Sequence, residues 1–407
     1  MLRLYNSLTR KAENFVPVEN KKVTIYVCGI TPYDTTHLGH AFVYMSFDAL
    51  IRYLQFRGYE VTYTQNVTDI NDRDKDILQR AKEQNVSWCK LADYWTKKFL
   101  KDMRDLNWKM PNHYLKASEN ITEMIDLIER LIKNGFAYQK NGSVYLDISK
   151  KKDFGKLSGF NRKKMLEIAK NFDEDIDNPD KKDKLDITLW RSSSKNQPVH
   201  IPSFDSSFGK GRPGWHIECS AMSIKTLGEQ IDPFDKLRVN GEHYRTIDIH
   251  GGGIDLIYPH HEAEIAQSEG ATLKSPFVKY WMHVGTVYYK GEKMSKSLGN
   301  LVMVSDLLKK YSANAIRFLL LSKKREEKWE FEEKDLIKSE KQISLILKAL
   351  KQKSKENRDN DKYIKKFISL MDNDIDTPRA LKLMIDLAHK SETLPLKTIF
   401  SVLGFTL

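Results

Sequence analysis

The sequence predicts an α/β protein built on a parallel β-sheet, and three consecutive segments carry the prediction. Residues 21–27 (KKVTIYV) are β-branched and aromatic and are soon followed by Gly29, which is typical of a buried strand. Residues 40–57 place apolar side chains at helical spacing before Gly58, and residues 60–67 form a second strand-like run. A strand, a helix and a strand in succession indicate a βαβ unit and hence a sheet of Rossmann type.

The remainder of the chain divides by composition. Charged helical segments dominate after residue 73, with one hairpin at Asn141-Gly142, and residues 171–186, rich in Asp, Asn and Lys, are expected to be a solvated connector. Sheet-like, glycine-rich sequence returns at 186, and amphipathic helices follow residue 305. The predicted divisions are 1–72, the first half of the Rossmann domain; 73–185, a mainly helical insertion; 186–290, the second half with a metal site; 291–315, a loop and linker; and 316–407, a helical domain.

Composition excludes several classes of protein. The 407 residues suggest two or three domains, and 40% hydrophobic residues with 18 Phe and 18 Tyr argue against intrinsic disorder. The sequence has no membrane-length apolar run and no signal-like N-terminus, and three cysteines fit no disulfide framework, so a cytoplasmic protein is expected. A net charge of +12 favours a polyanionic partner such as nucleic acid, although a lysine-rich proteome gives the same charge without one.

The segment HLGH (37–40) is the first candidate site. His37 and His40 lie three residues apart at a predicted helix start, where free N–H groups and the helix dipole attract anions. Two imidazoles there can donate hydrogen bonds to nucleotide phosphates, and Gly39 lets a flat base approach the backbone. Two incidental histidines would explain the segment equally well.

The pentapeptide KMSKS (293–297) is the second candidate site. Lys293 and Lys296 on a short polar loop can reach a triphosphate as point charges, and the serines add hydroxyl donors. A charged surface loop is the alternative, but the combination with HLGH favours a nucleotide site.

Four further residues form a credible zinc set. Cys28 ends a predicted strand, Cys219 lies in GWHIECS, and His260 and Glu264 are four residues apart in a helix opened by Pro259. Two thiolates, an imidazole and a carboxylate suit Zn²⁺. Buried structural thiols, or a closed structural zinc, would explain these residues as well. Cys89 is expected to be an ordinary residue.

The pairing of HLGH with KMSKS resembles the class I aminoacyl-tRNA synthetases. The segments YVCGITPYD, NVTDIND, GRPGWHIECSAMS, DIHGGGIDLIYPHHEAEIAQSE and GEKMSKSLGN closely resemble the cysteinyl-tRNA synthetases, and the resemblance runs to about residue 390. It implies a zinc ion on Cys28, Cys219, His260 and Glu264, joined by the substrate thiolate. It implies ATP with Mg²⁺ at His37, Gly39, His40, Lys293 and Lys296, of which all but Gly39 would be catalytic. It implies a cysteine pocket of Gly29, Thr68, Trp215 and His250.

The implied activity is a cysteine–tRNA ligase, which activates L-cysteine with ATP and transfers it to tRNA-Cys, acting as a cytoplasmic monomer with no membrane partner. No general base is expected, because a carboxylate is already a nucleophile. His216 and His261 are expected to be structural. Residues 232–246 resemble an insertion relative to that family, without an assigned use.

Three departures from the family concern the acceptor. Asn71 and Val284 stand where those synthetases usually carry Asp and Asn, and the chain ends at Leu407, so the anticodon-binding module is expected to be absent. A ligase that transfers cysteine to a small-molecule amine, as in the mycothiol pathway, is the main alternative. An inactive paralogue that binds tRNA or nucleotide as a regulator is an alternative of another class, and a small-molecule nucleotidyltransferase is a further one.

Overall fold

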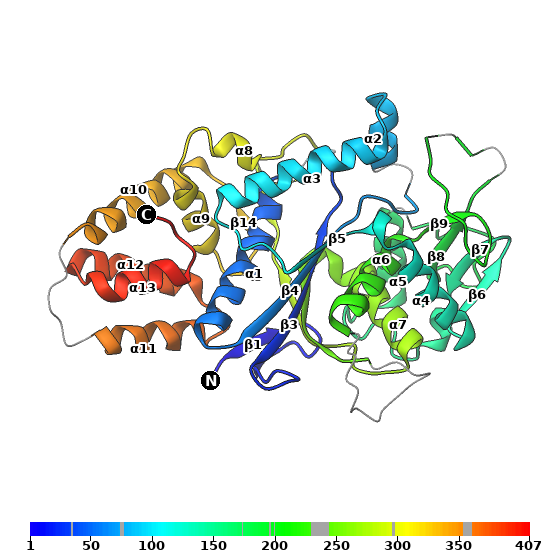
Figure 1. Ribbon diagram of the computed structural model, residues 1–407, viewed down its shortest axis with the longest axis horizontal. Helices are drawn as coiled ribbons and strands as arrows, with labels where there is room; N and C mark the ends of the chain where they lie inside the picture. The colour runs from blue at the N-terminus through cyan, green and yellow to red at the C-terminus, as the bar shows by residue number, and fades with distance from the viewer. Residues whose placement is uncertain are drawn as a thin grey trace.

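A parallel five-stranded sheet lies at the centre of the computed structural model (Figure 1). The structure describes residues 1–33, 36–73, 77–172, 174–194, 197–198, 200–228, 244–294, 298–352 and 360–407. The strand order in the sheet is β11-β10-β3-β4-β5, and every neighbouring pair is parallel. The strands are β3 (Lys22–Ile30), β4 (Glu60–Val67), β5 (His113–Lys116), β10 (Ile247–Gly253) and β11 (Val278–Val284).

The predicted βαβ unit is confirmed. Helix α1 (Leu38–Phe56) connects β3 to β4, and it buries Phe42, Phe47 and Leu50 in the main hydrophobic core. Gly58 follows the helix with φ of +82°, a left-handed conformation that glycine adopts without a steric penalty. Since a short loop leads from the end of β3 at Ile30 to the start of α1 at Leu38, the N-terminus of this helix lies at the carboxyl edge of the sheet.

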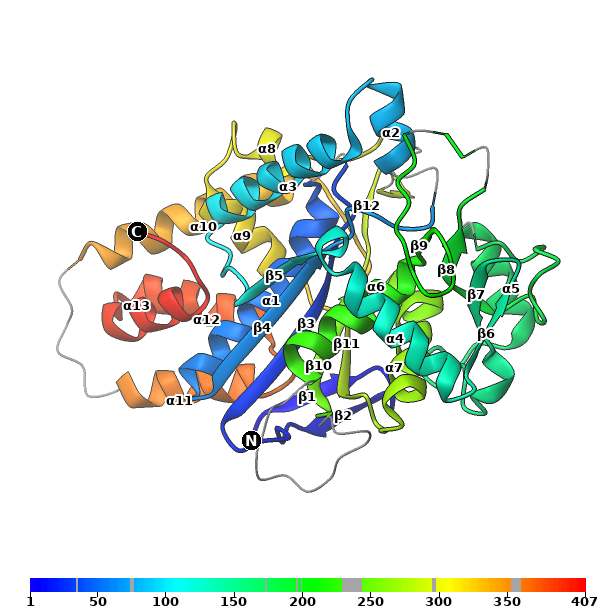
Figure 2. The same cartoon turned by 45° about the vertical axis from the view of Figure 1, so that its right-hand side comes forward.

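A second, antiparallel sheet lies at one end of the molecule, while helices α10 to α13 lie at the opposite end (Figures 1 and 2). The predicted hairpin is confirmed, because β6 pairs with β7 across Asn141 and Gly142, both with positive φ. The strands of this sheet are β6 (Ala137–Lys140), β7 (Ser143–Leu146), β8 (Ile187–Ser192) and β9 (Gly211–Pro213). The helices before and after the hairpin are α2 (Ile77–Glu83), α3 (Trp88–Asp105), α4 (Ile121–Lys133) and α5 (Arg162–Asn171).

Strand β5 was not predicted from the sequence. Its four residues, HYLK, show no clear alternation of apolar and polar side chains, and their pairing with β4 provides the strand conformation. The predicted domain boundaries at residues 72, 185, 290 and 315 stay predictions.

Two helices behind the central sheet carry the most unusual segments. The segment WHIECSAMS forms α6 (Trp215–Ser223) rather than sheet, and α7 (Glu262–Thr272) follows a π-helical turn, η5 (Ile257–His261). The glycine run 251–253 ends strand β10 rather than forming a loop. A β-carbon on Gly251 would lie 2.2 Å from Phe47 of α1, so this glycine allows the helix to pack closely on the sheet.

The chain ends in a group of packed helices, as predicted. Helix α10 contacts α9 and α12, and α11 contacts α12 and α13. The remaining elements are β1 (Arg3–Asn6), β2 (Lys11–Asn14), β12 (Val287–Tyr289), β13 (Glu292–Lys293), α8 (Val304–Leu307), α9 (Ala313–Leu321), β14 (Trp329–Glu330), α10 (Glu333–Leu350), α11 (Asn360–Met371), α12 (Thr377–Lys390) and α13 (Thr393–Val402). Among the described helices, none is long and apolar enough to cross a bilayer.

Candidate active site

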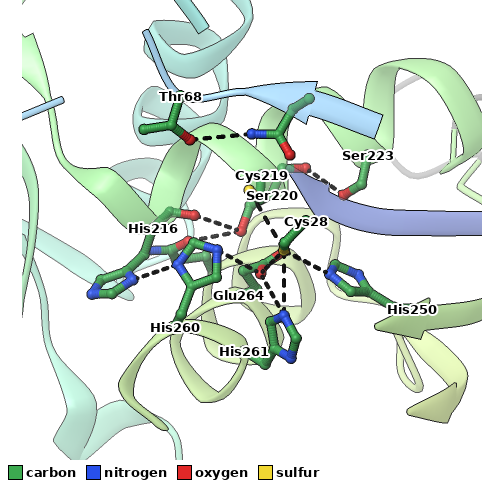
Figure 3. A network of polar contacts seen from close by, with 12 residues as sticks. Cys28, Thr68, His216, Cys219, Ser220, Ser223, His250, His260, His261 and Glu264 are labelled. Carbon is green, nitrogen blue, oxygen red and sulfur yellow. Dashed lines mark hydrogen bonds and ion pairs between the residues drawn. The ribbon is translucent and has the colours of Figure 1, made fainter. Parts of the chain in front are cut away.

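The four predicted metal ligands lie together in the core. One ligand atom of each of Cys28, Cys219, His260 and Glu264 lies within 4.8 Å of the other three, and all four residues are buried (Figure 3). Cys28 comes from the end of β3 and Cys219 from α6. The Nε2 atom of His260 is 3.2 Å from Oε1 of Glu264, so the predicted spacing of four residues brings the two side chains together although η5 and not α7 carries His260.

The chemistry of this cluster fits a soft divalent cation. Burial raises the pKa of the Cys28 thiol and of the Glu264 carboxyl well above their usual ranges, and the neighbouring Cys219 raises both further. Burial likewise lowers the pKa of His260 well below its usual value. The cluster therefore lacks a buried positive charge, and Glu264 Oε2 makes no hydrogen bond among the described residues. A cation would supply the missing charge.

The spacing of the two sulfur atoms is that of two thiolates on one tetrahedral metal ion. Two thiolates at about 2.3 Å from a tetrahedral Zn²⁺ lie about 3.8 Å apart. The Sγ atoms of Cys28 and Cys219 are 3.8 Å apart.

A second group of potential ligands shares half of the first. Cys28, Glu264, His250 and His261 also place one ligand atom each within 4.8 Å of one another. The Nε2 atoms of His261 and His250 lie 3.3 Å and 3.5 Å from Cys28 Sγ. Figure 3 shows His260 to the left of Cys28 and Glu264, His250 to their right and His261 below them. His261 was expected to be structural, but the structure places it in a second group of residues that could hold a metal ion.

The histidines of HLGH lie at the start of α1, as predicted. His37 is the residue that caps the helix, and its Nδ1 accepts a hydrogen bond from the backbone N–H of His40 at 3.3 Å. This bond assigns the proton of a neutral His37 ring to Nε2. The two rings stack with their centroids 3.7 Å apart. Both imidazoles therefore stand at the positive end of the helix dipole.

One cavity of about 360 Å³ extends from Cys28 to HLGH. Cys28 lies on its wall, and so do Gly39, His37 and His40. Lys293 of KMSKS lines the same cavity. Cys28, one of the four predicted metal ligands, thus faces the same space as the predicted nucleotide-binding residues, and this space is wide enough for a small ligand.

The segment after KMSKS is hydrogen-bonded to HLGH. The backbone N–H of Leu38 donates to the carbonyl of Val302 at 2.8 Å, and the N–H of Val304 donates to the carbonyl of Thr36 at 2.9 Å. Lys293 Nζ forms an ion pair with Asp255 Oδ2 at 2.9 Å, with both side chains about half exposed. Lys296 lies outside the described residues, as does His243 of the predicted insertion.

Comparison with known proteins identifies the family. Residues 14–341 match the family described as the catalytic domain of the class I (C) tRNA synthetases. The chain belongs to this family. The cysteine–tRNA ligase of Dehalococcoides mccartyi strain BAV1 is 41% identical over 395 residues, which cover 96% of this chain and 80% of that protein. The cysteine–tRNA ligase of Legionella pneumophila strain Corby is 40% identical, covering 100% of this chain and 85% of that protein.

A solved structure supports the class I synthetase fold. The methionyl-tRNA synthetase of Mycobacterium tuberculosis, solved with methionyl-adenylate, superimposes with a TM-score of 0.61 at 16% identity. The match covers 94% of this chain and 82% of that one. At this identity the likeness concerns the fold alone, and it confirms the predicted α/β class with a parallel sheet.

The four residues predicted to bind the amino acid of this synthetase separate into two pairs. Gly29 and Trp215 line the cavity, whereas Thr68 and His250 are buried outside its lining. Thr68 accepts a hydrogen bond from the side-chain amide of Asn66 at 3.2 Å, and His250 stacks on Trp281 with ring centroids 4.6 Å apart. The predicted role of all four residues in binding the amino acid stays a prediction.

The two residues expected to depart from the family pattern, Asn71 and Val284, are both fully buried. Val284 lines the cavity and belongs to the main hydrophobic core. Asn71 is buried, and its side-chain oxygen accepts a hydrogen bond from the backbone N–H of Arg73 at 2.8 Å. Of these two residues, only Val284 lines the cavity.

Sequence reasoning treated His216 and His261 only as structural residues, and the structure places both beside predicted metal ligands. His216 Nδ1 lies 2.8 Å from His260 Nδ1, and His261 Nδ1 lies 2.8 Å from His283 Nε2. His216 precedes Cys219 by three residues on α6, and His261 directly follows His260. This closeness in sequence to predicted ligands was a usable signal, since metal-bound histidines are usually held by outer hydrogen-bond partners.

Proposed function

We propose that this synthetase joins L-cysteine to tRNA-Cys in two steps. Cysteine and ATP with Mg²⁺ would first give cysteinyl-adenylate and pyrophosphate, and the cysteinyl group would then pass to the tRNA. The shared cavity carries this proposal, because it connects a thiolate-binding cluster containing Cys28 to the phosphate-binding groups His37, His40 and Lys293. The net charge of +12 suits a tRNA substrate.

The metal in this proposal is zinc. Cys28, Cys219, His260 and Glu264 would hold it, and their donor set and sulfur spacing support the choice. A bound Zn²⁺ would lower the pKa of the substrate thiol and hold its sulfur, which separates cysteine from serine where pocket shape alone cannot.

The protein groups in the first step act by positioning and electrostatics. The cysteine carboxylate attacks the α-phosphate without a general base, since it is already ionised. His37 and His40, at the N-terminus of α1, donate hydrogen bonds to the phosphate oxygens as negative charge develops. Lys293, with Lys296, neutralises the departing pyrophosphate. Lys293 leaves Asp255 to do so, and this exposed ion pair contributes little to stability.

Pyrophosphate exchange tests the first step. Purified protein with ATP and labelled pyrophosphate is expected to form labelled ATP when cysteine is added, and to form almost none with serine. Zinc chelation is expected to abolish the exchange, and added Zn²⁺ to restore it. Equal exchange with serine would contradict zinc-based selection of the amino acid.

A transfer assay tests the acceptor. The protein is supplied with ³⁵S-labelled cysteine, ATP and either tRNA-Cys or glucosaminyl-inositol, and the labelled product is identified. Label on the tRNA is the expected result. Label on the amine alone would show that the protein transfers cysteine to a small molecule. Asn71 and Val284, which were expected to differ from the family pattern, would then be linked to that acceptor.

The place of action and the oligomeric state belong to the same proposal. We expect a cytoplasmic enzyme, since three cysteines in a chain of this length fit a reducing compartment. We expect a monomer in solution, which light scattering on the zinc-loaded protein would test. A stable dimer at low micromolar concentration would contradict that expectation.

A further inference from the structure

A series of side-chain contacts connects His260, one of the predicted metal ligands, to Glu174 in the segment 174–186. Beyond His260 lies His216, with the two Nδ1 atoms 2.8 Å apart (Figure 3). The other ring nitrogen of His216, Nε2, is 3.0 Å from Oε1 of Glu174. His216 and His260 are fully buried, and the Glu174 side chain is 14% exposed. The sequence indicated a solvated connector at 171–186, but this carboxylate points inward.

The hydrogen bonds of this series have one direction that suits metal binding. A carboxylate only accepts, so His216 donates from Nε2 to Glu174. A neutral His216 then offers the lone pair of Nδ1, and His260 donates to it from its own Nδ1. This leaves the lone pair of His260 on Nε2, the atom that lies 3.2 Å from Glu264. In the reverse arrangement, His260 Nε2 would carry a proton and could not bind a metal.

Glu174 is itself held in the ionised form. Burial raises the pKa of Glu174, whereas the hydrogen bond that it accepts from His216 and the charge of Arg73 lower this pKa. Arg73 Nη2 lies 3.1 Å from Oε1 of Glu174. A permanent carboxylate at this position keeps the acceptor end of the series fixed across the physiological pH range.

Aromatic contacts form a second connection between Arg73 and His260, through Trp215. The Arg73 guanidinium lies 3.9 Å from the centroid of the Trp215 ring. Trp215 stacks on His260 with ring centroids 4.3 Å apart and an interplanar angle of 21°. His260 is therefore fixed by a hydrogen bond at Nδ1 and by a stacked ring on one face, and both contacts lead back to Arg73 and Glu174.

We propose that Glu174 is a positioning residue that acts through His216 to fix the ring proton and the orientation of His260 for the metal. The proposal rests on the zinc site of the proposed function but not on the identity of the acceptor. Removing such an outer partner typically weakens metal affinity about 10- to 100-fold. The affinity for Zn²⁺ is therefore the quantity to measure.

The experiment compares Zn²⁺ affinity by competition with a coloured chelator. Glu174→Ala is expected to weaken binding about 10- to 100-fold, and Glu174→Gln, which keeps an acceptor oxygen, to weaken it less. Asp175→Asn, an exposed carboxylate on the same segment, is the matched control and is expected to bind like the wild type. Thermal unfolding of the metal-free proteins separates positioning from folding, since a positioning role predicts similar midpoints for wild type and Glu174→Gln.

Two results would overturn the inference while leaving the proposed function intact. These are wild-type Zn²⁺ affinity in both Glu174 variants, or an equal loss of affinity in Asp175→Asn. Failure of the wild-type protein itself to bind Zn²⁺ would instead contradict the proposed function. As a second readout, the KM for cysteine is expected to rise in Glu174→Gln more than kcat for pyrophosphate exchange falls, because the substrate sulfur is held at the same site.

Discussion

The Sγ atoms of Cys28 and Cys219 lie 3.8 Å apart, although 191 residues separate the two cysteines along the chain. Cys28 lies near the end of strand β3 in the central sheet, and α6 packs against that sheet and presents Cys219 to it. The fold thus brings together two thiols from a strand and a helix. Cys28 also lines the cavity that His37 lines.

Replacing Cys219 by serine is expected to remove zinc and with it the activation of cysteine. An alcohol oxygen is a poor ligand for a soft metal at neutral pH, so zinc content by elemental analysis should fall below half an equivalent and exchange should fall at least about 100-fold. Cys89→Ser, which changes an exposed cysteine, is the control and should retain both. A zinc-loaded, active Cys219→Ser variant would contradict the predicted ligand set.

Replacing Lys293 by alanine is expected to slow the chemical step without changing cysteine binding. Loss of a preorganised cation beside developing charge typically costs about 10²- to 10³-fold in kcat. Steady-state exchange kinetics should therefore show a lower kcat with an unchanged KM for cysteine. Lys309→Ala provides the comparison, since Lys309 is exposed and pairs only with Asp306 among the ion pairs of the described residues. An equal effect of both substitutions would point to a general loss of charge.

Replacing Gly29 by alanine is expected to destabilise the fold. A β-carbon at this position would lie 1.5 Å from the carbonyl oxygen of Asn66 on the neighbouring strand β4, so the backbone must shift. Overpacking of this kind lowers the free energy of unfolding by about 3 kcal/mol or more. Urea denaturation measures the change. At Gly228 the nearest atoms to an added β-carbon are 3.6 Å away, so Gly228→Ala should leave the free energy nearly unchanged.

Stability is expected to fall on acidification because of buried His283. Burial and the nearby Arg325 lower the pKa of His283 to about 3, from an unfolded value near 6.5. Between these values the unfolded state binds the extra proton, so stability is present above pH 6.5 and is lost as the pH falls toward 3. Each such proton contributes up to about 1.4 kcal/mol per pH unit. In metal-free protein, the free energy of unfolding should decline less steeply between pH 6.5 and 4.5 for His283→Asn than for the wild type. Parallel curves of this free energy against pH for the two proteins would disprove the assignment to His283.

The sequence predicted the elements that carry strong local patterns. The β3–α1–β4 unit and the hairpin at Asn141-Gly142 follow from alternation, helical spacing and turn chemistry, which are local properties. The long-range association of Cys28 with Cys219 did not follow from spacing. It came from the resemblance of whole segments to a known family, which transfers a fold together with its motifs.

The inward position of Glu174 could not be predicted. The richness of a segment in Asp, Asn and Lys predicts that it is exposed on average. Nothing in this composition identifies which carboxylate will contact a buried histidine. The partner of Glu174 lies 42 residues further along the chain. Likewise, strand β5 exists because β4 offers it an edge, a property of the assembled sheet.

The wide sequence separation of the ligands has a consequence for folding. A metal bound to Cys28 and Cys219 closes a chain loop of 191 residues. Closing a loop of that length in an unfolded chain costs about 5 kcal/mol in entropy, so a retained ion would act like a long-range cross-link that restricts the unfolded state. Under the proposed function, the ion that selects the substrate would thereby also join strand β3 to helices α6 and α7, and its loss would favour unfolding.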